Sequence, residues 1–269
     1  MDTQRVSVRA PELANWLLSR GVSSQSTGEV AGYLGVPEDQ VRRRLHVPRQ
    51  RGQWVSPAHG LWIPVPLEYR TWGAPPGIEI VEALMRHMHV DYYVGWLSAA
   101  ELHGAAHQAP QVFQVATSRH VRPRQAGRTR FEFQIRTGLS ELPTMAFPTR
   151  SGTARVATPE LTMLDVASDV ALAGGIDNMA TVLIELAEHD QFDVARLTEL
   201  TARFPAAPAR RIGWILDSFA DMDGLDALRE TVASRAVTAS ILDPLGPDEG
   251  SVDRRWQLRI NRDVEDESS

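Results

Sequence analysis

Three consecutive arginines, Arg42, Arg43 and Arg44, carry the chemistry needed to contact a polyanion. The guanidinium group is a planar fork of donors that suits phosphate oxygens and the bidentate recognition of guanine. Gln40 precedes the three arginines in the sequence. Together these four side chains form a candidate surface for entering the major groove of double-stranded DNA.

The elements that must position this surface are predicted to be helices. Residues 11–21 have apolar side chains at helical spacing and end at a glycine, which predicts a first helix. Ser26 and Glu29 have the spacing of a capping box, which predicts a second helix that ends at Gly35. A third helix follows Pro37 and is predicted to stop at Pro48.

The third helix carries the arginines. With Val41 and Leu45 turned inward, a helical wheel directs Gln40 and Arg43 outward and leaves the two other arginines on the flanks, where phosphates would lie. We therefore interpret it as a recognition helix. The alternative is that the charged run only solvates a surface helix.

A basic hairpin is predicted after the third helix. Two short apolar runs, 54–55 and 61–63, flank a turn at 57–60, so the segment resembles a wing. Arg49, Arg51 and His59 are expected to hold the DNA backbone there. The order of three helices and a hairpin favours a winged helix-turn-helix in residues 1–70, although the same fold can also bind protein.

A larger domain is predicted for residues 71–269, after a proline-rich boundary at 64–76. Residues 94–105 are expected to form a helix, 112–116 and 131–135 strands, the segment from 159 to 219 several helices, and 256–260 a strand before an acidic tail. The predicted fold class is α+β: a winged helix-turn-helix followed by a mixed α/β domain with a helical second half.

A second basic group lies between the two predicted strands of the larger domain. It consists of Arg119, Arg122, Arg124, Arg128 and Arg130, in a loop interrupted by proline and glycine. Such a local positive field suits an acidic partner. The sequence leaves open whether that partner is the DNA backbone, the surface of a toxin protein, or only solvent.

Composition limits the remaining chemistry. The 269-residue chain has no cysteine and no lysine, and its net charge is −6. The absence of cysteine excludes disulfides and thiolate sites and fits a cytoplasmic protein. The N-terminus has no apolar run long enough for a signal peptide or a membrane span, so no membrane association is expected.

Histidines and carboxylates are the side chains in this sequence that could form an enzymatic or metal site. His103 and His107 stand at i, i+4 with Glu101 nearby, and His87 and His89 flank a methionine, but no further ligand is evident. The aspartates at positions 165 and 169 lie on a helical pattern, unlike the strand carboxylates of a nucleotidyltransferase. We therefore expect no catalytic residue, no metal and no cofactor.

Several blocks of the larger domain resemble the AbiEi family of antitoxins. The match centres on Tyr92 to Gln108, within GIEIVEALMRHMHVDYYVGWLSAAELHGAAHQAPQVFQVATSRHVRP, and the segments 157–167, 173–188, 209–217 and 242–265 follow in the same order. The family consists of transcriptional regulators of type IV toxin–antitoxin (abortive infection, phage defence) systems and includes mycobacterial antitoxins.

The resemblance implies a transcriptional autorepressor that binds inverted repeats in its operator and counteracts a nucleotidyltransferase-like toxin protein from the same operon. Two other functions remain open from the residues themselves. One is a ligand-responsive winged-helix repressor without a toxin. The other is a nucleic-acid-processing enzyme whose winged helix only delivers the substrate.

Overall fold

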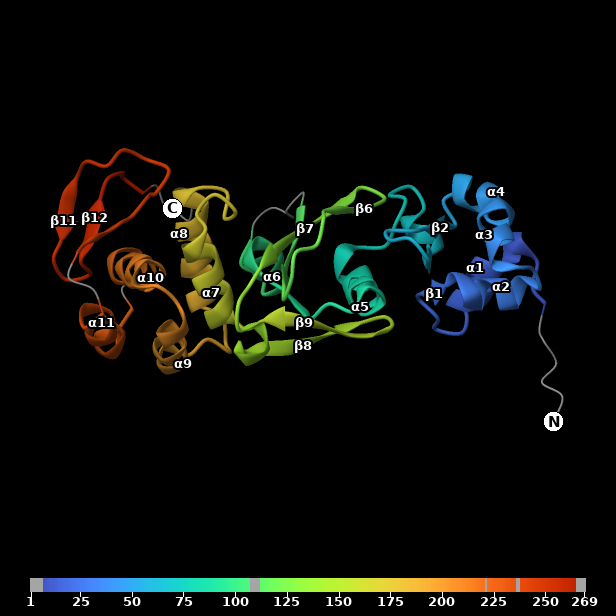
Figure 1. Cartoon of the computed structure of the whole chain (residues 1–269). Helices are drawn as coiled ribbons and strands as arrows, with labels where there is room; N and C mark the ends of the chain where they lie inside the picture. Colours follow the sequence, from blue (N-terminus) through green and yellow to red (C-terminus); the bar gives the residue numbers. More distant parts are fainter. Residues whose placement is uncertain (1–6, 107–111, 221, 236–237, 265–269) are drawn as a thin grey trace. The chain divides into compact units, whose positions relative to one another are not determined.

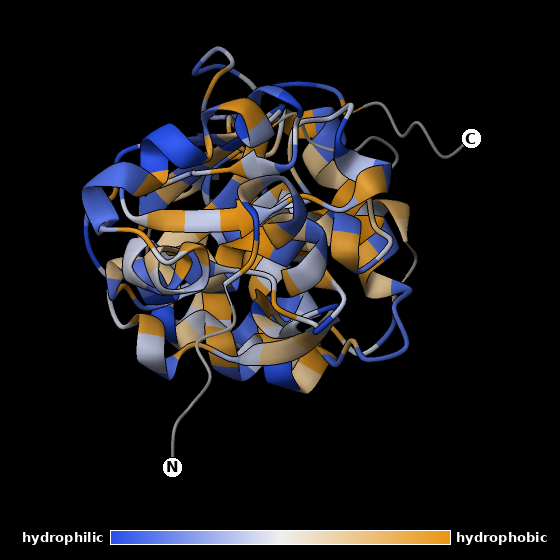
Figure 2. Cartoon of the chain, turned by 90° about the vertical axis from the view of Figure 1, so that its right-hand side faces the viewer, coloured by the Kyte–Doolittle hydropathy of each residue, from blue (hydrophilic) through white to orange (hydrophobic). Residues whose placement is uncertain are grey.

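The computed structural model describes residues 7–106, 112–220, 222–235 and 238–264 (Figure 1). The chain divides into two compact units. Unit 1 comprises Met1–Tyr93, Gln111–Ser140 and Ala146–Arg155, and unit 2 comprises Val94–Pro110, Glu141–Met145 and Val156–Ser269. Figure 2 shows polar and apolar residues alternating along the helices and strands, as expected of elements that bury one face.

The N-terminal part of unit 1 has short helices followed by a hairpin. Its elements are α1 (Ala10–Leu18), β1 (Gln25–Ser26), α2 (Thr27–Leu34), α3 (Glu38–Arg44), α4 (His46–Gln50), β2 (Trp54–Val55) and β3 (Leu61–Pro64). Strand β3 pairs antiparallel with β1 and with β2, with Ser26 opposite Leu61 and Val55 opposite Ile63. This arrangement is consistent with the predicted winged helix-turn-helix.

The capping signals of the sequence are present in the structure. The backbone N–H of Ser26 donates to the Glu29 carboxylate at 2.7 Å, and the Glu29 N–H donates to the Ser26 hydroxyl at 3.3 Å. Gly35 ends α2 in the left-handed region, with φ +64°. Val41 and Leu45 are fully buried, as the recognition-helix interpretation requires.

One helix boundary was predicted wrongly. The helix that carries the arginines ends at Arg44, and Pro48 does not stop it but lies in the first turn of α4. Proline is tolerated there because the N–H groups of a first helical turn have no acceptor within the helix. Arg49 consequently lies on a helix and not in a loop.

A mixed sheet of six strands lies within the described residues, in the order β6-β7-β5-β4-β9-β8. The strands are β4 (Tyr92–Val94), β5 (Val112–Thr117), β6 (Arg124–Ala126), β7 (Thr129–Ile135), β8 (Thr144–Thr149) and β9 (Gly152–Ala157). Strand β5 is parallel to β7, and β6 is antiparallel to it. The two strands predicted at 112–116 and 131–135 are confirmed as β5 and β7.

Two sequence interpretations in this region were wrong. The segment predicted as a loop contains β6, so Arg124 and Arg130 lie on paired strands joined by a tight turn at Gly127, where φ is +55°. A three-residue polar strand has no apolar alternation that could reveal it. Val94, assigned to a helix, lies in β4, because a short buried apolar run does not distinguish a strand from a helix.

The proline-rich segment of unit 1 is tied to its surroundings. It contains the 3-10 turn η1 (Leu67–Tyr69) and leads into α5 (Gly77–Met88). The Arg70 guanidinium donates to Asn15 Oδ1 at 2.7 Å, and Arg150 pairs with Glu68 at 2.5 Å. This hydrogen bond from Arg150 lowers the pKa of the Glu68 carboxyl. The domain boundary at residue 70 stays a prediction.

Unit 2 is helical and ends in a small sheet. Its helices are α6 (Trp96–Leu102), α7 (Pro159–Ser168), α8 (Ile176–Ala187), α9 (Val194–Leu200), α10 (Ala206–Phe219) and α11 (Asp226–Ala233), with a short 3-10 turn η3 (Thr201–Arg203). Another 3-10 turn, η2 (Leu139–Glu141), lies where the chain passes from unit 1 to unit 2. The strands β10 (Ser240–Ile241), β12 (Leu258–Ile260) and β11 (Ser251–Asp253) form the sheet in this order. The predicted helical second half is confirmed. The strand expected at 256–260 begins later, since Gln257 has φ +49°.

The close packing of α10 against Trp256 gives a first prediction. A Cβ at Gly213 would lie 2.1 Å from the Trp256 ring, which is buried and donates from its Nε1 to Asp217 at 2.9 Å. We expect Gly213→Ala to lower the free energy of unfolding by about 1–3 kcal/mol, because the indole has to move. Urea unfolding followed by circular dichroism measures this.

The matched control is Gly32→Ala on α2, where a Cβ would meet nothing within 4 Å. Alanine is the better helix former, so this variant should gain about 0.5–1 kcal/mol. Equal stabilities of the two variants would contradict the packing of α10 on Trp256.

Candidate nucleic-acid interface

The exposed face of α3 carries the predicted recognition residues. Arg42, Arg43 and Arg44 are all exposed. The Arg43 guanidinium donates to Gln40 Oε1 at 3.4 Å, so these two side chains lie together on the outer face of the helix. This is the geometry that a base-reading pair needs before it enters a groove.

A cleft of about 1110 Å³, here called the wing cleft, lies on one side of α3. It is lined by Arg42 of α3, Arg49 of α4 and His59 of the wing turn, among other residues. The Arg49 guanidinium lies over the Trp62 ring, 5.6 Å from its centroid, a cation–π contact that orients the charge. The structure thus brings together one predicted residue from each of three elements.

A second cleft has a volume of about 500 Å³ and is here called the amino-terminal cleft. It is lined by two of the predicted arginines that do not line the wing cleft. Arg44 and Arg51 line it together with Arg9. Arg51 was predicted to act beside Arg49, but the structure separates the two between the clefts. The α3 face therefore has arginines on both flanks, as a helix in a groove between two phosphate strands would need.

The five arginines of the second basic group have different surroundings in the structure. The Arg119 guanidinium donates to the carbonyl of Met88 at 2.8 Å, and Arg128 lies 5.5 Å from the centroid of the Trp72 ring. Arg130 forms an ion pair with Glu132 at 2.8 Å. Arg122 is exposed to solvent, and Arg124 lines the wing cleft.

Three further residues line the wing cleft. Glu38 and Asp39 lie at the first turn of α3, where the sequence pattern indicated only the start of a helix. A carboxylate at this position can accept a hydrogen bond from the amino group of cytosine. His87 also lines the cleft, and its Nε2 donates to the carbonyl of His59 at 2.9 Å. No local signal could link residues so far apart in the sequence.

His87 and His103, two of the four histidines considered as metal ligands, donate hydrogen bonds to backbone carbonyls. His103 Nε2 donates to the carbonyl of Ala157 at 2.8 Å, and its ring lies 5.2 Å from that of His189. Burial lowers the pKa of His103. His107 lies outside the described residues. Across 7–106, 112–220, 222–235 and 238–264, no group of three or more His, Asp or Glu side chains could hold a metal ion.

The charge of the chain is unevenly distributed. Residues 1–64 contain eight arginines and five acidic residues, whereas the whole chain has a net charge of −6. Residues 1–64, which supply most of the lining of both clefts, therefore have a net positive charge, and the remainder of the chain is strongly negative. Positive charge concentrated around an exposed helix favours a polyanionic partner.

Comparisons with known proteins concern mainly the rest of the chain. Residues 93–218 match the family model of the AbiEi antitoxin C-terminal domain. The crystal structure of the RV2827C protein from Mycobacterium tuberculosis is similar in fold, with a TM-score of 0.67 and 16% sequence identity over 96% of this chain and 94% of that one. None of the curated proteins compared with the chain matches it significantly.

Within the described segments no helix is long and apolar enough to cross a membrane. The blocks at 157–167, 173–188 and 209–217 that carried the resemblance lie within the matched range, whereas 242–265 lies beyond it. The α3 arginines and His59 lie N-terminal to that range, whereas Arg124 of the wing cleft lies within it. The match over residues 93–218, a little under half of the chain, thus supports an AbiEi-type antitoxin.

Proposed function

We propose that the chain represses its own operon by binding an operator with inverted repeats, and that its AbiEi domain counteracts a nucleotidyltransferase-like toxin from the same operon. The observation that carries the DNA-binding part is the exposed α3 face, with Gln40 and Arg43 on its ridge and arginines in the clefts on both flanks. The antitoxin part rests on the domain match at residues 93–218.

The residues divide into two roles in this proposal. Gln40 and Arg43 read base edges in the major groove, because they project from the ridge of the helix. Arg42 and Arg49 on one flank, and Arg44 and Arg51 on the other, neutralise phosphates and fix the register of the helix. His59, in the turn of the wing, contacts the DNA backbone.

Single substitutions separate the two roles. We expect Arg43→Ala to cost about 1–3 kcal/mol on the operator and to relax base preference, since it removes a base contact. Arg51→Ala should weaken operator and random duplexes alike, because a phosphate contact carries no sequence information. Gel-shift titrations at fixed salt with both duplexes measure the two effects.

Normal operator binding by both variants would overturn this placement of the interface. Both proteins should retain the circular dichroism spectrum of the wild type, since both side chains are exposed and lie outside the buried core. A variant that loses its fold would show this in the spectrum and not only in the titration.

A further inference from the structure

We propose that the wing cleft holds a stretch of DNA phosphate backbone, and that Arg124 of β6, outside the winged helix, is one of its cationic contacts. This inference rests on the proposed function, because it extends the DNA-binding surface beyond the N-terminal helices and the hairpin. It assigns the sheet of unit 1 a direct part in binding.

The geometry of the cleft supports this assignment. Arg42, Arg49 and Arg124 line the same space of about 1110 Å³, although Arg124 follows Arg49 by seventy-five positions in the sequence. The wing turn is held against α5, since His87 donates to the carbonyl of His59 at 2.9 Å. A Cβ at Gly60 would lie 3.5 Å from the same histidine ring, so the turn and α5 are in van der Waals contact. The elements that carry His59 and His87 are thus fixed before DNA arrives.

Arg124 differs from three of its neighbours because its side chain forms no hydrogen bond, ion pair or ring contact among the residues that the structure describes. Arg119, Arg128 and Arg130 are each bound to a carbonyl, a ring or a carboxylate. Among the residues that the structure describes, Arg124 has no ion pair, and its buried Nε has no hydrogen-bond partner. Because Arg124 also lines the wing cleft, its positive charge can act on a ligand that enters the cleft.

The charges that line the cleft favour an anionic partner that also extends along α3. Three arginines line it against two carboxylates, Glu38 and Asp39, and both carboxylates stand at the first turn of α3, where base edges would pass. Continuity with Arg42 and Arg49 favours duplex DNA over an acidic protein, because a DNA strand beside α3 would run directly into the cleft.

The salt dependence of DNA binding tests the inference. We expect Arg124→Ala to weaken binding to a random-sequence duplex and to reduce the slope of log Kobs against log salt by about 0.9, the loss of one phosphate contact. Arg124→Lys should restore most of the slope, because it keeps the charge. The matched control is Arg122→Ala, an exposed arginine of the same segment that does not line the cleft and should leave the slope unchanged.

The outcomes distinguish this inference from the proposed function. If the wild type binds duplex DNA and Arg124→Ala has the wild-type slope, the cleft holds no phosphate at this residue and the inference is wrong. The same result is expected if the cleft binds a protein and not DNA. Equal losses in the Arg122 and Arg124 variants would also overturn it, since the effect would be one of net charge. If the wild type binds no DNA, the proposed function itself fails.

Discussion

Replacing Arg42, Arg43 and Arg44 together by alanine is expected to abolish operator binding while leaving toxin neutralisation intact. The three side chains are exposed on α3, so their loss should not disturb the core formed around Val41 and Leu45. If each contact contributes about 1–3 kcal/mol, their joint loss lowers affinity by at least on the order of a hundredfold. The matched AbiEi domain begins at residue 93, well beyond α3.

Two measurements on the full-length chain check this expectation. A reporter gene behind the operon's promoter measures repression, and growth during co-expression of the neighbouring gene product measures neutralisation. A control with Arg196, Arg254 and Arg255 replaced by alanine removes the same charge from exposed positions of unit 2 and should still repress. A folded α3 variant that lost both activities would show that repression and neutralisation share one surface.

The sequence predicted those parts of the interface that local signals define. The capping box at Ser26, the glycine at position 35 and the inward pair Val41 and Leu45 each depend on residues a few positions apart, and all are present in the structure. These signals fix the helices, and the helices fix which arginines face outward. The orientation of the α3 arginines was therefore accessible without a structure.

Contacts between distant segments were not accessible in this way. Strand β6 exists because it pairs with β7, and its own residues, Arg124 to Ala126, carry no strand signal. Its place at the wing cleft depends on how the sheet and α5 lie against the wing, with His87 bound to His59 across a long sequence separation. Periodicity reports only on one element at a time.

Buried arginine was a second feature that the sequence concealed. Arginine is seldom fully buried unless its donors are satisfied, so Arg210 and Arg211 of α10 gave no indication of a core position. In the structure Arg210 is completely buried and Arg211 is 6% exposed. Burial lowers the pKa of both groups, and the nearby Asp243 opposes this effect at Arg211.

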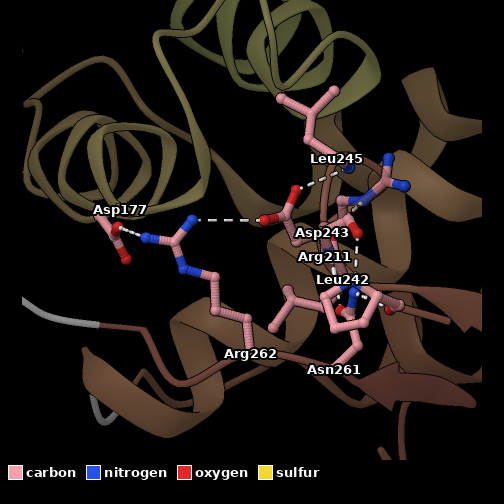
Figure 3. Close-up of polar contacts among 8 residues, drawn as sticks. Asp177, Arg211, Leu242, Asp243, Leu245, Asn261 and Arg262 are labelled. Atoms are coloured by element: carbon pink, nitrogen blue, oxygen red, sulfur yellow. Dashed lines mark hydrogen bonds and ion pairs between the residues drawn. The ribbon is translucent and has the colours of Figure 1, made fainter. Parts of the chain in front are cut away.

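The Arg211 guanidinium connects α7 to the C-terminal sheet within unit 2. It donates to the carbonyl of Ala167 at 2.8 Å, to Leu242 at 2.8 Å and to Ile241 at 2.9 Å. Figure 3 shows the neighbouring carboxylate of Asp243, which faces Arg262. These contacts join the C-terminal sheet to the helices by polar groups that are hidden from water.

The carboxylate and the backbone carbonyl of Asp243 are both held by neighbouring groups. Asp243 is 2% exposed and accepts from the backbone N–H of Leu245 at 2.9 Å. Arg262 pairs with it at 3.5 Å and with Asp177 of α8 at 2.7 Å, and Asn261 donates to the Asp243 carbonyl at 2.8 Å (Figure 3). A buried carboxylate needs such compensation, because an isolated charge in the interior is strongly unfavourable.

Arg211→Ala is accordingly expected to be the most destabilising single substitution considered for this chain. It removes the donor that three carbonyls share, those of Ala167, Ile241 and Leu242, removes a positive charge near Asp243 and opens a cavity, at a combined cost of about 3–5 kcal/mol. Arg211→Lys should lose part of this energy, because one ammonium cannot reach all three carbonyls in the same geometry. Arg255→Ala is the control: its side chain is 51% exposed and forms a single ion pair with Asp217, so it should cost less than about 1 kcal/mol.

Urea unfolding gives the free-energy differences, and amide hydrogen exchange locates them. Faster exchange at β10 and β12 than in α2 would show that the loss lies in the contacts of the C-terminal sheet, because those strands are joined to α10 through Arg211. Equal stability of the Arg211→Ala and Arg255→Ala proteins would contradict a structural role for the buried guanidinium. Since the affected contacts lie within unit 2, we expect operator binding at temperatures below the transition to remain, while neutralisation is lost at a lower temperature than in the wild type.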